Sequence, residues 1–503
     1  MARALLRAFA ALSLTAPLHN ALLAQGSSVV QAGRPSETSM AMLPMTSSSA
    51  AAKMHAMLGQ RALETNHPLE AAQHFEQAIA ADSTLAFARL GAANASTSFA
   101  EYDAKLSAAA RFAEHASRAE QLQISIARKS LVNDFAGAEA LARELVTAEP
   151  KNPRAYLALA SVQQQMGREL EARRTMERAI AIAPTFSPAY AQLAFSYMTS
   201  QPTDAAKAGP YVDKLVSLEP TEAGTFIAQG SFFRATNQLP RARSAYSRAA
   251  QLDPTMALPL QQRGHVASFM GDYDAARADY DAAIKLGKQN EAASFGVFRA
   301  LVAVHSGKPE QGIAELDRLV GEIDGMKVSD PRGAKIGALD AEIQVAIQSG
   351  DFASAARAIA QRTPLVREQV AGASEETVKR IAEGSIAYYE GMLAARQGDS
   401  IVAKARAAEV RRVLASTNDP RKDQGAHAIL GVLALEGKDF KAAASHLAQA
   451  NPNDVYLMYE RALALDGAGQ PSEAKALFRK IAQWNFNGPD AALARREAAE
   501  RLH

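Results

Sequence analysis

The side chains best suited to metal binding or acid–base chemistry are the ten histidines, and they are scattered along the chain. His55, His67 and His74 fall near one another, but only His67 and His74, seven residues apart, could share a helix face. A turn containing Pro68 separates these two, so we expect solvated surface positions. The chain has no His-Glu-x-x-His motif, and the sequence predicts no metal site.

Sulfur chemistry has little support in this sequence. The chain contains no cysteine, which excludes disulfides, thiolate catalysis and zinc–thiolate sites. Met40, Met42 and Met45 could offer thioethers to a soft metal, yet no His or Cys accompanies them. We therefore interpret these methionines as incidental residues of a linker and predict no cofactor.

Hydrolysis, phosphoryl transfer and nucleic-acid binding are also disfavoured. The chain has neither a Gly-x-Ser-x-Gly nucleophile turn nor a Gly-rich phosphate loop ending in Lys-Ser/Thr. Acid pairs such as Glu375–Glu376 and basic pairs such as Arg173–Arg174 are typical of solvated helix faces. A net charge of +2, with 21% charged residues, gives no basic field for nucleic acid. The sequence predicts a protein that is not an enzyme, with an enzyme of unrecognised type as an alternative.

The elements that carry these side chains follow a repeated pattern. Ala242, Tyr246, Ala249 and Pro254 are followed by the similar set Ala276, Tyr280 and Ala283, and the first alanines of the two sets lie 34 residues apart. Self-similarity at this period predicts stacked pairs of helices. The alanines let helices approach closely, the aromatic residue fills the wedge between pairs, and proline ends the second helix. We predict an all-α, right-handed α-solenoid of about twelve helix-turn-helix units.

These residues resemble those of a tetratricopeptide repeat, and the resemblance covers roughly residues 52–484. It is weakest at 84–118 and 288–383, where repeat boundaries are not defined. The chain also resembles bacterial exported tetratricopeptide repeat proteins. The resemblance implies a scaffold that binds a protein or peptide partner. The Lys and Asn pair of the carboxylate-binding variety is replaced by Ala191 and Phe195, so capture of a chaperone C-terminus is not expected.

In this family the concave groove is lined chiefly by the first helix of each pair. The spacing places the following residues in that groove: Leu157, Ser161, Phe195, Met198, Ile227, Arg234, Gln261, His265 and Phe269. The apolar members suit an extended peptide or one amphipathic helix, with Arg234 and His265 beside them. Packing of the same residues against neighbouring helices is the alternative. A second alternative function is a structural adaptor of an envelope complex, binding through its convex face or its ends.

The N-terminus has the order of residues found in secretory signals. Arg3 and Arg7 precede an apolar run over 8–18, and small residues follow at Ala24 and Gly26. The run is shorter than the roughly 20 residues of a membrane-spanning helix, so an uncleaved anchor is the less favoured interpretation. No cysteine follows the run, which excludes a bacterial lipid anchor. We expect an exported protein, periplasmic or secreted, with no integral membrane segment after cleavage, and a monomer or weak homo-oligomer.

Composition and repeat pattern together divide the chain. The predicted divisions are a signal peptide at 1–26, a flexible linker at 27–50, an N-terminal array at 51–319, a break at 320–335, and a C-terminal array with a capping helix at 336–503.

Overall fold

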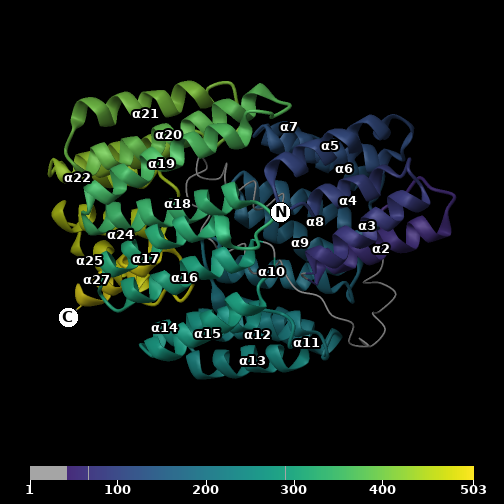
Figure 1. Ribbon diagram of the computed structural model, residues 1–503, viewed down its shortest axis with the longest axis horizontal. Helices are drawn as coiled ribbons and strands as arrows, with labels where there is room; N and C mark the ends of the chain where they lie inside the picture. Colours follow the sequence, from purple (N-terminus) through teal and green to yellow (C-terminus); the bar gives the residue numbers. More distant parts are fainter. Residues whose placement is uncertain (1–41, 66, 289, 503) are drawn as a thin grey trace. The chain divides into compact units, whose positions relative to one another are not determined.

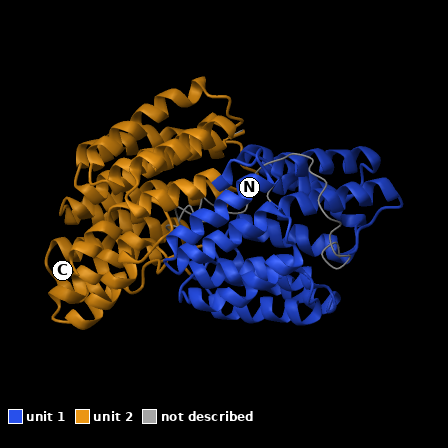
Figure 2. Ribbon diagram, turned by 90° about the horizontal axis from the view of Figure 1, so that it is seen from below, with its two compact units in different colours: residues 1–3, 21–259, 417–420 blue, residues 4–20, 260–416, 421–503 orange. Residues whose placement is uncertain are grey.

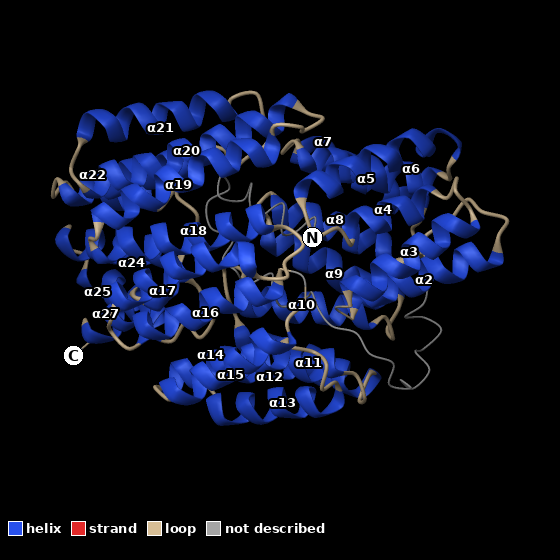
Figure 3. Ribbon diagram, in the orientation of Figure 1, coloured by secondary structure: helices blue, strands red, loops and turns tan. Residues whose placement is uncertain are grey.

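The computed structural model describes residues 42–65, 67–288 and 290–502 of the chain (Figure 1). The helices pack into two compact units, coloured separately in Figure 2. Throughout the described part of the chain the regular elements are helices, without strands, so the predicted all-α fold is confirmed (Figure 3). None of the helices within these ranges is long and apolar enough to span a bilayer.

Unit 1 comprises described residues 42–259, together with 417–420. Its helices are α2 (Ala50–Glu64), α3 (Pro68–Ala81), α4 (Ala86–Asn94), α5 (Phe99–Phe112), η3 (Ala113–His115), α6 (Arg118–Leu131), α7 (Phe135–Ala148), α8 (Pro153–Gln165), α9 (Glu169–Ile182), α10 (Ser187–Thr199), α11 (Ala205–Leu218), α12 (Ala223–Ala235) and α13 (Leu239–Leu252). Each even-numbered helix packs against the odd-numbered helix that follows it. The even-numbered helices are therefore the first helices of the pairs, and the side they form is called the first-helix face below.

Unit 2 comprises residues 260–416 and described residues 421–502. The first two residues of α14, Leu258 and Pro259, belong to unit 1, and the rest of the helix belongs to unit 2. Its helices are α14 (Leu258–Met270), α15 (Tyr273–Leu286), α16 (Glu291–His305), α17 (Pro309–Glu322), η4 (Ile323–Gly325), α18 (Pro331–Ser349), α19 (Phe352–Val370), α20 (Glu376–Arg396), α21 (Ser400–Leu414), α22 (Gln424–Glu436), α23 (Phe440–Leu447), α24 (Val455–Gly467), α25 (Pro471–Ala482), α26 (Pro489–Ala492) and α27 (Ala494–Glu500). Within the described ranges α2 to α25 form twelve successive pairs, as predicted.

The recurring Gly-Asp dipeptide forms the turn inside a pair. Gly271 has φ +76° and Gly350 has φ +82°, a left-handed conformation that glycine adopts at little cost and that ends the first helix. The Asp that follows then caps the second helix, because the Asp272 carboxylate accepts the N–H of Ala275 at 3.3 Å. The dipeptide thus ends one helix and begins the next.

The predicted small and aromatic anchors pack as expected inside the pairs. Tyr246 and Tyr280 are fully buried. A Cβ atom on Gly230 would lie 2.6 Å from the ring of Tyr246, and one on Gly264 would lie 3.0 Å from the ring of Tyr280. Such distances leave no room for a side chain, so glycine in the first helix lets the aromatic residue of the second helix fill the core.

The region of weak repeat signal contains longer helices. Helices α18 and α19 each have 19 residues and α20 has 21, whereas most helices of unit 1 have 13 or 14. These extra turns shift the apolar positions away from a 34-residue template. The predicted break at 320–335 contains η4 and a loop, but α17 still packs against α18 across it. The division into arrays at that point remains a prediction, as does the signal peptide at 1–26, which lies outside the described residues.

Two buried carboxyls in unit 2 predict a pH-dependent stability. Burial raises the pKa of Glu342 to about 7 and that of Glu460 to about 7, although Arg357 and Arg396 oppose these shifts. A raised folded-state pKa stabilises the protein below the unfolded pKa of 4.5, and this stability is lost as pH rises through 7. We expect a loss on the order of 2 kcal/mol for each carboxyl between about pH 4.5 and 7.

The urea midpoint at pH 5 and pH 7.5 measures this effect, and a Glu342→Gln, Glu460→Gln double variant is its control. Buried His305 has the opposite effect on stability. Burial lowers its pKa to about 4, so the stability that neutral His305 provides is lost as pH falls below 6.5. Asp490, whose pKa burial raises to about 7, and Glu291, whose pKa burial raises to about 8, keep their contributions in the double variant. The difference in stability between pH 5 and pH 7.5 should therefore be smaller in the double variant than in the wild type. Identical pH profiles for the two proteins would contradict the assignment.

Candidate functional site

Unit 1 contains a cavity of about 90 Å³ on its first-helix face, between α2, α10 and α12. Its lining residues are Arg61, Glu64, Thr65, Ser187, Pro188, Ala191, Phe195, Met198, Leu215, Glu219, Glu222, Gly224, Thr225, Ile227, Ala228 and Ser231. The volume would hold one apolar side chain or a few water molecules. The cavity is therefore a pocket for part of a ligand rather than for a whole cofactor.

Three of the predicted groove residues meet in this cavity. Phe195 and Met198 project from α10, and Ile227 projects from α12. The spacing of three residues places the first two side chains on one face of α10. Ile227 is 3% exposed, whereas Phe195 is half-buried and available to a ligand. Three apolar residues of the predicted groove therefore line one cavity of unit 1, whereas Leu157 and Phe269 do not.

Ion pairs lie at the edge of the same cavity. Arg61 Nη2 lies 2.9 Å from Glu219 Oε1 and 3.7 Å from Glu222 Oε1, and Ser187 Oγ donates to Glu219 at 2.7 Å. Glu64 is paired with Arg154 of α8. Because Arg61 is shared by two carboxylates, the edge of the cavity carries excess negative charge, which favours a basic or neutral ligand.

Other predicted groove residues of unit 1 lie outside this cavity. Leu157 belongs to a core cluster with Met176, and Ser161 accepts a hydrogen bond from Gln165 at 3.5 Å. Arg234 is 1% exposed, with its guanidinium 5.8 Å from the ring centroid of Tyr246. The aliphatic part of Arg234 is therefore buried between α12 and α13, and its charge lies near the Tyr246 ring instead of in the groove.

The remaining predicted residues, Gln261, His265 and Phe269, are buried on α14 in unit 2. The Nδ1 atom of His265 lies 2.6 Å from the hydroxyl of Tyr280. The Phe269 ring meets the His305 ring edge-on at 5.5 Å between centroids. These residues form a buried polar and aromatic cluster with Tyr280 and His305.

An extended segment of the chain, 42–47, lies against α6 and α8 in unit 1. Asn152 Nδ2 donates to the carbonyl of Met42 at 2.9 Å, and Ser117 Oγ donates to that of Pro44 at 2.8 Å. The carboxylate of Glu120 accepts the N–H of Thr46 at 2.8 Å. Leu43, 3% exposed, packs into the core cluster of α6 to α8. The last part of the predicted linker at 27–50 is therefore held by specific contacts.

Histidine pairs are the polar feature that sequence reasoning missed. His74 is paired with His55 at 3.2 Å between their Nδ1 atoms, rather than with His67. His427 and His446 form the same contact at 2.9 Å. Both pairs are separated by 19 residues, which is the signal that would have revealed them. No group of three or more potential metal ligands occurs within the described ranges.

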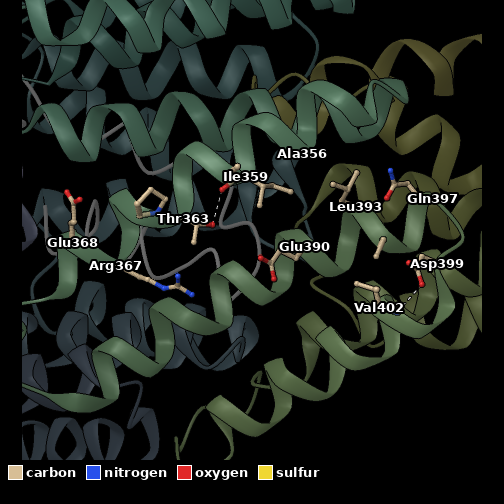
Figure 4. Close-up of a pocket in the computed structure, with 13 residues that line it drawn as sticks. Ala356, Ile359, Thr363, Arg367, Glu368, Glu390, Leu393, Gln397, Asp399 and Val402 are labelled. Carbon is tan, nitrogen blue, oxygen red and sulfur yellow. Dashed lines mark hydrogen bonds between the residues drawn. The ribbon is translucent and has the colours of Figure 1, made fainter.

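A larger and more open groove lies on the second-helix side of unit 2, between α19, α20 and the start of α21 (Figure 4). Its volume is about 680 Å³. Ile359 and Leu393 supply apolar surface, while Arg367 and Glu390 place both signs of charge along it. Val402 of α21, 40% exposed, closes one end. This groove was not among the predicted sites.

Comparison with known proteins agrees with the helix-pair pattern. Models of the tetratricopeptide repeat family match residues 132–196 and 259–290. The chain is 30% identical over 145 residues to the mouse protein O-mannosyl-transferase TMTC1, covering 28% of this chain and 15% of that protein. It is 23% identical over 179 residues to anaphase-promoting complex subunit 3 of Schizosaccharomyces pombe, covering 36% of this chain and 26% of that protein.

The chain thus matches only a minor part of the length of either relative. A solved tetratricopeptide repeat protein from Parabacteroides merdae is 13% identical, with a TM-score of 0.36, over 54% of this chain and 99% of that one. The matched family models fall on α7 to α10 and on α14 and α15. On these two matches and the array of helix pairs, the chain is a member of the tetratricopeptide repeat family.

Proposed function

We propose that this protein is a non-catalytic scaffold that binds a protein or peptide partner on the first-helix face of unit 1. The observation that carries the proposal is the cavity between α2, α10 and α12, lined by Phe195, Met198 and Ile227. An apolar side chain of the partner enters this cavity. Such an anchor in a small pocket is the usual centre of a peptide interface.

The charges around the cavity indicate which residues the partner segment should carry. Glu222 shares Arg61 with Glu219, which leaves negative charge beside the apolar pocket. A partner segment with an apolar anchor next to a Lys or Arg satisfies both features. The carboxylates of the cavity are already held in ion pairs, so they serve recognition and do not act as general bases.

We also propose that the protein is exported and acts in the periplasm or outside the cell. The support is the order of basic, apolar and small residues at 1–26. Mass spectrometry of the protein isolated from its source cells is expected to find Ser27 as the first residue. A mature chain that retains residues 1–26 would contradict cleavage after Gly26.

Filling the cavity tests the binding site. Ala191→Phe places a ring into existing space at a half-buried position, so partner binding should be lost while stability is kept. Ala206→Phe, at an exposed position of α11, is the matched control. Full-length chains serve as bait in an extract of the source cells, and circular dichroism confirms equal helicity. A partner retained by the Ala191→Phe chain would refute binding in this cavity.

The open groove of unit 2 favours a second candidate function, an assembly adaptor that binds through its second-helix side. Ala360 lies in this groove and is exposed, so Ala360→Arg adds a charge without disturbing the core. A partner lost by Ala360→Arg and retained by Ala191→Phe would identify the adaptor. The opposite pattern would identify the scaffold of unit 1.

A further inference from the structure

The first-helix face of unit 2 is covered by an extended segment of the chain itself. Residues 484–490, with the sequence Trp-Asn-Phe-Asn-Gly-Pro-Asp, lead from α25 into α26. All seven residues are buried, and Asn487 at their centre is 4% exposed. Segment 484–490 therefore lies inside unit 2, although most of it has no helical structure.

The side-chain amide of Asn487 is bound on both of its ends. Its Nδ2 atom lies 3.1 Å from His265 Nδ1 and 3.2 Å from the hydroxyl of Tyr280, and its Oδ1 atom lies 2.8 Å from His305 Nε2. The three partners come from α14, α15 and α16. An amide can donate and accept at once, so asparagine satisfies all three partners, whereas an apolar residue would leave them without hydrogen bonds.

Further polar contacts hold the ends of segment 484–490. Gln348 of α18 donates to the carbonyl of Pro489 at 3.2 Å. The Asp490 carboxylate accepts the N–H of Val455, the first residue of α24, at 3.1 Å. Side chains and backbone groups of α14, α15, α16, α18 and α24 thus bind the segment through hydrogen bonds. An extended peptide is recognised in the same way.

The packing beside Asp490 is incomplete. A space of about 20 Å³ lies between Asp490, Gln348 and Tyr456. Within the described residues, Oδ1 of Asp490 and Oε1 of Gln348 have no hydrogen-bond partner. Water that enters this space when the segment leaves would satisfy both atoms.

We propose that the first-helix face of unit 2 is a peptide-binding surface and that segment 484–490 is its intramolecular ligand. Because the ligand is tethered through α25, its effective concentration is on the order of millimolar, and it closes the surface to other peptides. When the segment leaves, the surface takes an extended peptide with a central asparagine. This proposal concerns a different unit from the proposed function and stands or fails independently of it.

The test releases the segment from the folded full-length chain. A protease recognition sequence is inserted after Gln483, which is exposed in the turn that follows α25. After cleavage, the fragment 484–503 should dissociate on dilution while the rest of the protein keeps its helicity. A fluorescent synthetic peptide of residues 484–503 should then bind the emptied surface, and excess unlabelled peptide should displace it.

The affinities of variant peptides show whether the surface recognises the Asn487 side chain. Asn487→Ala removes three hydrogen bonds and should weaken binding at least about tenfold. Glu500→Ala, whose side chain is 61% exposed, is the matched control and should bind within about twofold of the wild type. Loss of the helices of unit 2 on release, absence of exchange with labelled peptide, or equal binding of the Asn487→Ala peptide would each overturn the proposal.

Discussion

Replacing Gly91 by Ala is expected to destabilise unit 1 by about 2 kcal/mol, within the range measured for overpacked cores. A Cβ atom on Gly91 would lie 2.2 Å from Cε1 of Phe75 and 2.3 Å from its Cζ. The ring cannot move away easily, because it is fully buried, lies 3.0 Å from the Cβ position of Gly59, and meets Phe87 edge-on at 6.3 Å between centroids. The higher helix propensity of alanine offsets only about 1 kcal/mol of the cost.

Gly337→Ala is the matched control for this change. Gly337 also lies inside a helix, α18, but a Cβ atom there has no neighbour within 4 Å. The added methyl group should stabilise the protein by about 0.5–1 kcal/mol. Urea titrations followed by circular dichroism measure both changes. If the Gly91→Ala midpoint equals or exceeds that of the wild type, the close contact with Phe75 does not limit stability.

The second large effect is expected for Arg362→Met, about 3–5 kcal/mol, as found when one partner of a buried ion pair is removed. Arg362 is 1% exposed, and its guanidinium is paired with Asp340 of α18. It also donates to Ser385 Oγ at 3.2 Å and lies 4.7 Å from the ring centroid of Tyr389. Methionine fills much of the space but leaves the Asp340 carboxylate without its cation.

Asp340 predicts how this loss depends on pH. Burial already raises the pKa of Asp340 in the wild type, against the opposing effect of Arg362, and removal of Arg362 raises it further. The stability associated with a raised carboxyl pKa is present at low pH and is lost as pH rises through that value. The destabilisation by Arg362→Met should therefore be smaller at pH 4.5 than at pH 8.

A double-mutant cycle separates the ion pair from packing. Asp340→Leu combined with Arg362→Met removes both charges, so the double variant should be more stable than Arg362→Met alone. The unfolding free energies of the four proteins give the coupling between the two side chains. Strictly additive effects would show that the buried charge of Asp340 is not the source of the loss.

The sequence predicted those parts of the fold where small and aromatic anchors recur at a constant distance. Ala242, Tyr246 and Tyr280 are buried as expected because a close helix crossing needs a small residue opposite a ring. The longer α18, α19 and α20 broke the period, so boundaries between 288 and 383 could not be placed from the pattern. Periodicity detects helices of constant length and loses register when turns are added.

The candidate site was predictable only in part. Phe195, Met198 and Ile227 line the cavity because their helical spacing fixes which face they occupy. Arg234 is buried against Tyr246, since a long side chain can cross a helix pair in a way that spacing does not reveal. The extended segments 42–47 and 484–490 have no period at all, and their places depend on contacts with distant helices.

Ion pairs join the first helix pair of unit 1 to its last helices. They should change the order in which the helix pairs unfold locally, compared with a linear repeat array. In a linear repeat array the terminal pairs fray first, because each has a neighbour on only one side. Here Arg61 of the first pair is bound to Glu219, and His67 Nε2 lies 3.5 Å from Asp253 at the end of α13. The first pair therefore has neighbours on two sides. Amide hydrogens of α2 should exchange with solvent about as slowly as those of the central helices.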